Sequence, residues 1–176
     1  TREPALLPAL NSDGVPVLIP YYQIINQSGV DLQLITGQWL WKFEGIYRTG
    51  QGSSFFASTA GVEYSFVSLF GTKADLGVLI EGLYDDRGAA ATTPFENDIM
   101  AGVRLAVNDA SSTEALFGVI QDLDMDSRFF FVEASRRITD HLKATVEVRV
   151  QDLSMNDRFR ALRDDDFALL NLEYFF

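Results

Sequence analysis

Apolar and polar residues alternate along most of this chain, in stretches of about ten residues separated by residues typical of turns. The clearest stretch lies within residues 141–153, where every second residue is apolar and the residues between are charged or polar. Successive side chains of an extended strand point to opposite faces, so a period of two predicts strands with one apolar and one polar face. The same period predicts further strands within residues 39–48, 56–66, 75–85, 98–108, 130–137 and 166–176.

Two segments do not give a single interpretation. Residues 114–123 contain apolar side chains on both faces, because Leu116, Phe117, Val119 and Ile120 do not alternate. Residues 17–35 are one long strand if the period is followed straight through, which gives nine strands in all. A turn at residues 26–29 (NQSG) would divide that segment and give ten.

The connections between these strands differ in length. Those at residues 37–38 and 139–140 are short, whereas those at 87–96 and 154–165 are longer. Short turns on one side and longer loops on the other are typical of outer-membrane β-barrels, although the outer connections near 49–53 and 124–127 are also short.

The chain ends on an alternating strand, in which Leu172, Tyr174 and Phe176 share one face. An apolar edge strand invites aggregation unless the sheet closes on itself. This ending resembles the C-terminal signal of bacterial outer-membrane β-barrels, where the last residue is typically Phe and another aromatic residue precedes it by two positions. The resemblance implies that Leu172, Tyr174 and Phe176 form a barrel-assembly signal.

Further motifs extend the resemblance over most of the chain. The run WLWKFEGIYR at residues 39–48, GVEY at 61–64, DDRG at 85–88 and EASRR at 133–137 are similar to the C-terminal portion of longer, functionally uncharacterised outer-membrane proteins of Gram-negative bacteria. That resemblance implies that the chain forms the wall of a barrel, and it identifies no catalytic residues.

Composition limits the alternatives. The 176 residues are 47% hydrophobic, yet no run approaches the roughly 18 apolar residues of a membrane-spanning helix. The net charge of −11 argues against binding nucleic-acid phosphates.

These patterns together predict an all-β fold, an antiparallel up-and-down transmembrane β-barrel with nine or ten strands in this chain, in the bacterial outer membrane. Residues 1–16 are expected to form an N-terminal arm or extracellular loop. Residues 17–176 are expected to form the barrel domain, either closed with ten strands or the C-terminal part of a larger barrel.

In such a barrel the apolar face meets lipid and the polar face lines the lumen. The charges expected to line the lumen are Lys42, Glu44, Glu63, Glu81, Arg104, Glu133, Arg137, Glu147, Arg149 and Glu173. In a narrow barrel they would form a ladder of ion pairs, and in a wider one they would line an aqueous path that prefers cations.

The expected function is that of a non-enzymatic, porin-like passive pore or of a structural or assembly component of the outer membrane, with no catalytic residues and no cofactor. The expected partners are outer-membrane lipids and lipopolysaccharide, the barrel-assembly machinery and other membrane or periplasmic subunits, without nucleic acid.

Two alternatives stay open. One is a lipid-modifying enzyme, for which the single histidine, His141, lies at a turn without a serine motif. The other is a soluble β-barrel that buries its apolar face around an apolar ligand.

One motif indicates metal binding weakly. In DLDMDSRFFFVE, Asp122, Asp124, Asp126 and Glu133 occupy the spacing of a calcium-binding EF-hand. Ser127 replaces the required glycine, and the residues that follow predict a strand. An acidic hairpin tip is therefore expected, with Asp122, Asp124 and Asp126 as weak metal candidates.

Overall fold

The computed structural model describes residues 5–50, 52–157 and 159–176, which form eleven strands and three short 3-10 turns. No α-helix occurs in these ranges, and none of their helical turns is long and apolar enough to cross a membrane. The elements are β1 (Ala5–Leu10), β2 (Pro16–Tyr21), β3 (Asn26–Thr36), β4 (Trp39–Thr49), β5 (Phe55–Phe66), η1 (Leu69–Gly71), β6 (Asp75–Asp85), η2 (Gly88–Ala90), β7 (Asn97–Ala106), β8 (Glu114–Asp122), β9 (Arg128–Thr139), β10 (Leu142–Asp152), η3 (Arg160–Leu162) and β11 (Phe167–Tyr174).

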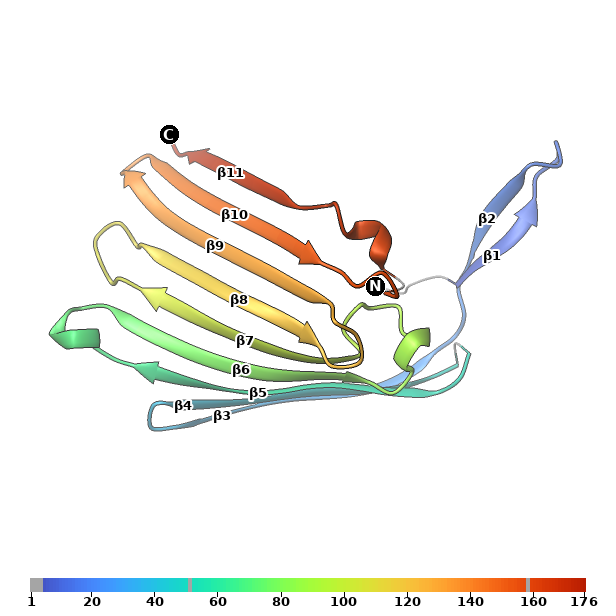
Figure 1. Ribbon diagram of the computed structural model, residues 1–176, viewed down its shortest axis with the longest axis horizontal. Coiled ribbons are helices and arrows are strands. Elements are labelled where there is room, and N and C mark those ends of the chain that lie inside the picture. Colours follow the sequence, from blue (N-terminus) through green and yellow to red (C-terminus); the bar gives the residue numbers. More distant parts are fainter. Residues whose placement is uncertain (1–4, 51, 158) are drawn as a thin grey trace.

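Nine strands, β3 to β11, form one sheet in which each strand pairs antiparallel with the next along the chain. The sheet is curled, and the β1–β2 hairpin projects away from it (Figure 1). The all-β, antiparallel, up-and-down fold predicted from the alternation is therefore confirmed. Strands β3 and β11 are the two edges of an open sheet, so closure into a barrel stays a prediction.

The predicted strand number is wrong, because the described residues form eleven strands rather than nine or ten: nine in this sheet and two in the hairpin. The turn considered at residues 26–29 is absent: β3 begins at Asn26 and pairs with β4 straight through Gly29. The break lies instead at residues 22–25. Upstream of it β2 pairs only with β1, and Pro20 of β2 has no N–H to donate to a ladder.

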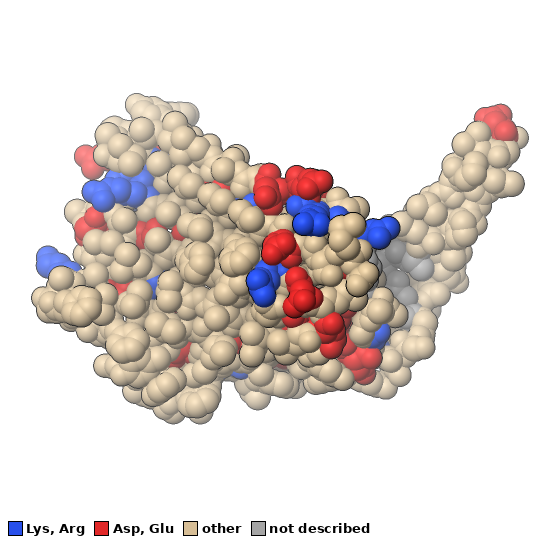
Figure 2. Space-filling view, in the orientation of Figure 1, with Lys and Arg blue, Asp and Glu red and all other residues tan. Residues whose placement is uncertain are grey.

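The nine-strand register places most apolar positions on one face, called here the outer face, and most charged positions on the other, the inner face. A row across neighbouring strands shows the outer face: Trp41, Val62, Ile80, Ala101 and Val119 are successive register partners on β4 to β8. Outer-face side chains are exposed, with Leu32 60% and Ile80 47% accessible, whereas Glu63 of the inner face is 4% accessible. In the view of Figure 2, uncharged side chains cover most of the surface over the strands, and charged ones gather toward both ends of the strands.

Strand β8, which the sequence left ambiguous, is apolar on both faces. Phe117 and Val119 lie on the outer face, whereas Leu116 and Ile120 lie on the inner face. Ile120 is a register partner of Phe129 on β9, and both line the same cavity on the inner side. The inner face is therefore not polar throughout, and the period of two is lost where an inner apolar cluster forms.

Glycine residues of the inner face allow long side chains to lie flat across neighbouring strands. A Cβ built at Gly77 on β6 would lie 2.5 Å from the Glu63 carboxylate, and one built at Gly118 on β8 would overlap the Phe131 ring. These positions are glycine because a larger residue would displace an inner-face side chain.

Candidate functional site

The inner face carries three groups of ion pairs that join different strands. Lys42 Nζ on β4 lies 3.0 Å from Glu81 Oε1 on β6. Arg104 on β7 pairs with Glu63 on β5.

The third group lies on β9 and β10. Arg149 on β10 contacts Glu133 on β9 at 2.5 Å and Glu147 on its own strand at 2.8 Å. Seven of the ten charges expected to line the lumen therefore meet in pairs or triads: Lys42, Glu63, Glu81, Arg104, Glu133, Glu147 and Arg149.

The other three, Glu44, Arg137 and Glu173, lie on the inner face by strand parity but form no ion pair among the described residues, although Lys143 is the register partner of Glu173. Glu173 accepts a weak hydrogen bond of 3.3 Å from Asn171, two residues away on β11. Arg137 is the register partner of Lys143, so two positive charges face each other near the short turns. Glu44 is the register partner of Asp31, so two negative charges face each other on β3 and β4.

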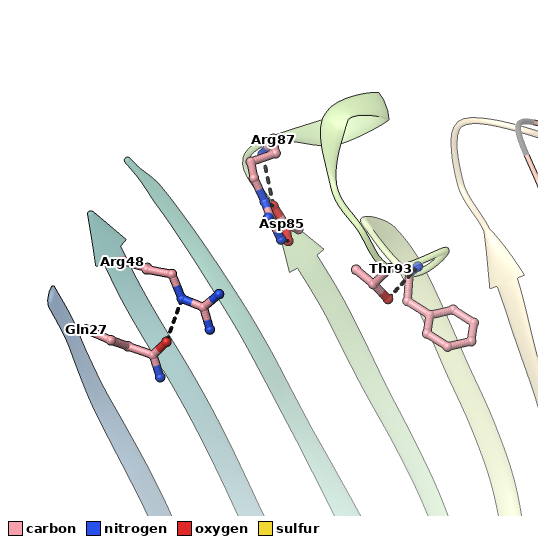
Figure 3. Close-up of polar contacts among 6 residues, drawn as sticks. Gln27, Arg48, Asp85, Arg87 and Thr93 are labelled. Atoms are coloured by element: carbon pink, nitrogen blue, oxygen red, sulfur yellow. Dashed lines mark hydrogen bonds and ion pairs between the residues drawn. The ribbon is translucent and has the colours of Figure 1, made fainter. Parts of the chain in front are cut away.

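Sequence reasoning missed an enclosed polar cluster, which lies where β5 begins and β6 ends. Arg87 donates from Nε to Asp85 Oδ1 at 2.9 Å and from Nη2 to Asp85 Oδ2 at 2.6 Å (Figure 3). The same guanidinium stacks 3.6 Å from the centre of the Phe55 ring. Asp85 is 3% and Phe55 4% accessible. In the sequence, only the DDRG motif at residues 85–88 draws attention to this region. The motif supports a resemblance to outer-membrane proteins but does not predict that Arg87 contacts Asp85 or Phe55.

This cluster begins the segment of residues 86–96, called here the strap, which packs against the inner face. Asp85 N–H donates to the Glu96 carbonyl at 2.8 Å and holds the two ends of the strap together. The Phe95 ring packs edge-on against Phe129 of β9, with ring centres 5.2 Å apart. The strap therefore reaches from β6 across to β9, and cavities of about 270 Å³ and 220 Å³ lie on either side of Phe95.

The acidic tip between β8 and β9 is a hairpin connection. Asp122 Oδ1 accepts hydrogen bonds from the backbone N–H groups of Asp124 and Met125 at 2.7 and 2.8 Å, so this carboxylate closes the turn. Asp124 accepts a bond from the Asn97 side chain, and Asp126 is exposed. Among the described residues, no three or more metal-binding side chains gather in one group.

A buried hydroxyl joins two connections at the end of the sheet where the strap lies. Ser127 Oγ, which is inaccessible to solvent, donates to Asp157 Oδ2 at 2.5 Å and accepts from the Ser154 backbone N–H at 3.0 Å. This contact connects the β8–β9 turn to the loop before β11.

The opposite end of the sheet holds the C-terminal residues and His141. Phe175 N–H donates to the His141 carbonyl at 2.8 Å, and His141 Nδ1 lies 3.1 Å from the Phe175 carbonyl oxygen. This histidine therefore contacts the Phe175 backbone, the Thr139 hydroxyl and the Tyr174 ring. Leu172 and Tyr174 lie on the outer face, 58% and 67% accessible, and Phe176 lies beyond the end of β11.

A turn at this end holds a carboxylate in its charged form. Asp109 accepts from the Thr113 backbone N–H at 2.9 Å and from its hydroxyl at 2.8 Å. Arg136 lies 3.7 Å away. The hydrogen bonds from Thr113, assisted by this arginine, lower the pKa of Asp109 below its ordinary value of 3.8.

Aromatic side chains form two rows on the outer face. Near the short turns, Trp39 and Tyr64 pack with ring centres 4.7 Å apart, as do Tyr64 and Phe66. Near the long loops, Tyr47 and Phe56 are register partners on β4 and β5. The two rows therefore bound an exposed apolar band.

No protein-family model, curated protein or solved structure matches this chain. Only the chemistry of its own residues therefore bears on its function.

Proposed function

We propose that this chain is the wall of a transmembrane β-barrel in the bacterial outer membrane, without enzymatic activity, that acts as a passive pore or as a structural or assembly component. The observation that carries the proposal is the inverted polarity of the sheet. Its outer face is apolar and exposed on all nine strands, whereas carboxylates of the inner face such as Glu63 and Asp98 are 4% and 2% accessible. A soluble barrel would bury the apolar face, so the exposed outer face disfavours that alternative.

The height of the apolar band supports a membrane location. From Trp39 to Tyr47 on β4, and from Phe56 to Tyr64 on β5, the two aromatic rows are nine residues apart, counting both ends. A transmembrane strand needs about 9–11 residues at a tilt of about 45°. Aromatic rows at both ends of such a band are typical of the two membrane interfaces.

The direction of the edge strands bears on the size of the barrel. Nine consecutive antiparallel strands leave β3 and β11 running in the same direction. Backbone groups of an open edge cannot stay unpaired in hydrocarbon, and closure with antiparallel neighbours on both edges needs an odd number of further strands. The geometry therefore favours a larger barrel over a nine-strand barrel closed by this sheet alone.

The apolar outer face and the C-terminal residues support a proposal for the partners. Outer-membrane lipids and lipopolysaccharide would cover the outer face, and the barrel-assembly machinery would recognise Leu172, Tyr174 and Phe176.

The two tryptophans of the chain offer a direct test, because both lie on the outer face, Trp39 in the aromatic row and Trp41 two residues into the band. In vesicles with bromine on the lipid acyl chains, we expect the fluorescence of both to be quenched. With only one tryptophan present, after Trp39→Phe or Trp41→Phe, Trp41 should be quenched by more deeply placed bromines than Trp39, since two residues of strand span about 6.6 Å.

Fluorescence unaffected by bromine in folded protein would contradict the membrane assignment. Planar-bilayer conductance then separates a pore from a structural barrel, since only the pore gives steps of current.

A further inference from the structure

The larger cavity beside the strap has the chemistry of a binding site. Its volume is about 270 Å³, and Glu44, Ile46, Thr59, Leu83 and Phe95 contribute to its lining. Pockets for drug-sized ligands occupy about 300–1,000 Å³, so this one suits a smaller molecule. We propose that it binds a small organic cation, of the size of a short alkylammonium ion, with Glu44 as the counter-charge.

The charge of the cavity is unbalanced. Glu44 and its register partner Asp31 make no ion pair or hydrogen bond with other described residues, and both lie on the inner face. Like charges directly opposite each other on neighbouring strands are destabilising, and an ammonium group between or beside them would remove that cost.

Three cationic side chains of the described residues near the cavity are engaged with other groups. Lys42, two residues from Glu44 on the same face, pairs with Glu81. Arg48 donates to Gln27 Oε1 at 2.7 Å, and Arg87 is held by Asp85 (Figure 3). A counter-ion for Glu44 would therefore come from outside these contacts.

The rest of the lining favours an organic cation over a hydrated metal ion. Ile46 and Leu83 present aliphatic surface, and Phe95 presents an aromatic ring that its packing on Phe129 holds in place. Ammonium groups with alkyl tails are stabilised by such rings and by apolar contact, whereas Mg²⁺ and Ca²⁺ need additional oxygen ligands. The Thr59 hydroxyl can accept one ammonium N–H.

The test compares three probes of nearly equal shape, n-butylammonium, n-butanol and n-butyrate, by calorimetric titration of the detergent-refolded chain at neutral pH. We expect the ammonium to bind about tenfold or more tightly than the alcohol, and the carboxylate not to bind. In Glu44→Gln the ammonium should bind no better than the alcohol, whereas Glu173→Gln, also on the inner face but near the other end of the sheet, should bind as the unchanged chain does.

Equal binding of the three probes, no binding at all, or an unchanged affinity in Glu44→Gln would overturn the site. Because Glu44→Gln removes a like-charge contact with Asp31, it should melt at the same temperature or higher, which guards against loss of binding through misfolding. A Phe95→Leu variant should weaken ammonium binding and leave alcohol binding nearly unchanged, because only the cation gains from the ring.

The cation site extends the proposed function by naming a class of solute. It rests on the proposed function in one respect, that the cavity lies inside a barrel lumen. Binding in detergent does not require a membrane, so the two proposals fail separately. Amine binding without tryptophan quenching would end the membrane assignment alone, and the opposite result would end the cation site alone.

Discussion

The Glu63 carboxylate on β5 pairs with the Arg104 guanidinium on β7, although β6 lies between their strands. The side chain passes over Gly77 of β6, the position where a Cβ would lie 2.5 Å from Glu63 Oε1. The Glu63 side chain is 5% accessible and that of Arg104 is 56% accessible, so the acid is enclosed and the base is largely exposed.

Replacing Gly77 by alanine should separate this pair. The new methyl group takes the space of the Glu63 carboxylate, which must then turn away from Arg104. We expect a loss of about 1 kcal/mol in the free energy of unfolding, a small figure because solvent screens the half-exposed arginine. Urea unfolding in detergent, followed by tryptophan fluorescence, would measure it.

Gly82→Ala is the matched control on the same strand, since a Cβ there meets no atom closer than 4.0 Å. Its stability should be unchanged or slightly higher, because alanine restricts the unfolded chain. An equal loss in both variants would show that the backbone, and not the ion pair, requires glycine.

Arg87→Lys should loosen the strap. Lysine keeps the positive charge but cannot make the two parallel hydrogen bonds to Asp85 or stack flat on Phe55. We expect a loss of about 1–2 kcal/mol and faster amide hydrogen exchange over residues 86–96, read by mass spectrometry. Arg128→Lys, at an exposed position, is the control. If exchange in the strap is the same in both variants, Arg87 does not hold it.

Ser127→Ala should free the loop before β11. The hydroxyl is the bond donor to Asp157 and the acceptor for the Ser154 N–H, so its removal leaves buried groups without these partners. A cost of about 1–3 kcal/mol is expected. Limited proteolysis should then cut within residues 153–166 sooner than in the unchanged chain. Ser135→Ala, which removes a hydroxyl from the middle of β9, should leave the cleavage rate unchanged.

The turn at Asp109 should respond to acid. Its pKa is lowered in the folded chain by the hydrogen bonds from Thr113, so it adds stability that is fully present above 3.8 and is lost as the pH falls through the lowered value. Exchange of the Thr113 amide should therefore accelerate in that acidic range and stay constant between pH 5 and 7. In Asp109→Asn the acid-dependent step should disappear, and a step that persists would assign it to another carboxyl group.

Much of the fold follows from local pattern. The alternation in residues 141–153 predicts β10 and its two faces, because the geometry of an extended strand alone decides which side chains share a side. The same reasoning gives the inner position of Glu63, Glu81 and Arg104. The pattern fails at residues 17–35, where apolar and polar residues keep alternating although the strand is interrupted. The interruption lies where β4 ends and can no longer pair with β3.

Only the tertiary structure shows which inner-face residues form ion pairs with one another. Whether Arg104 meets Glu63 or another acid depends on cross-strand register and on glycines that let a side chain cross a strand. The inward packing of the strap likewise depends on Phe95 meeting Phe129, which lies 34 positions further along the chain.

The sequence by itself determined most of the strands, their order of pairing and the face on which most residues lie, because these follow from a two-residue repeat and short connections between neighbours. Only the tertiary structure decided the ion pairs, the place of the strap and the cavity beside Glu44. Those features arise between segments distant in sequence, where register, sheet curvature and side-chain volume act together and no local pattern specifies the result.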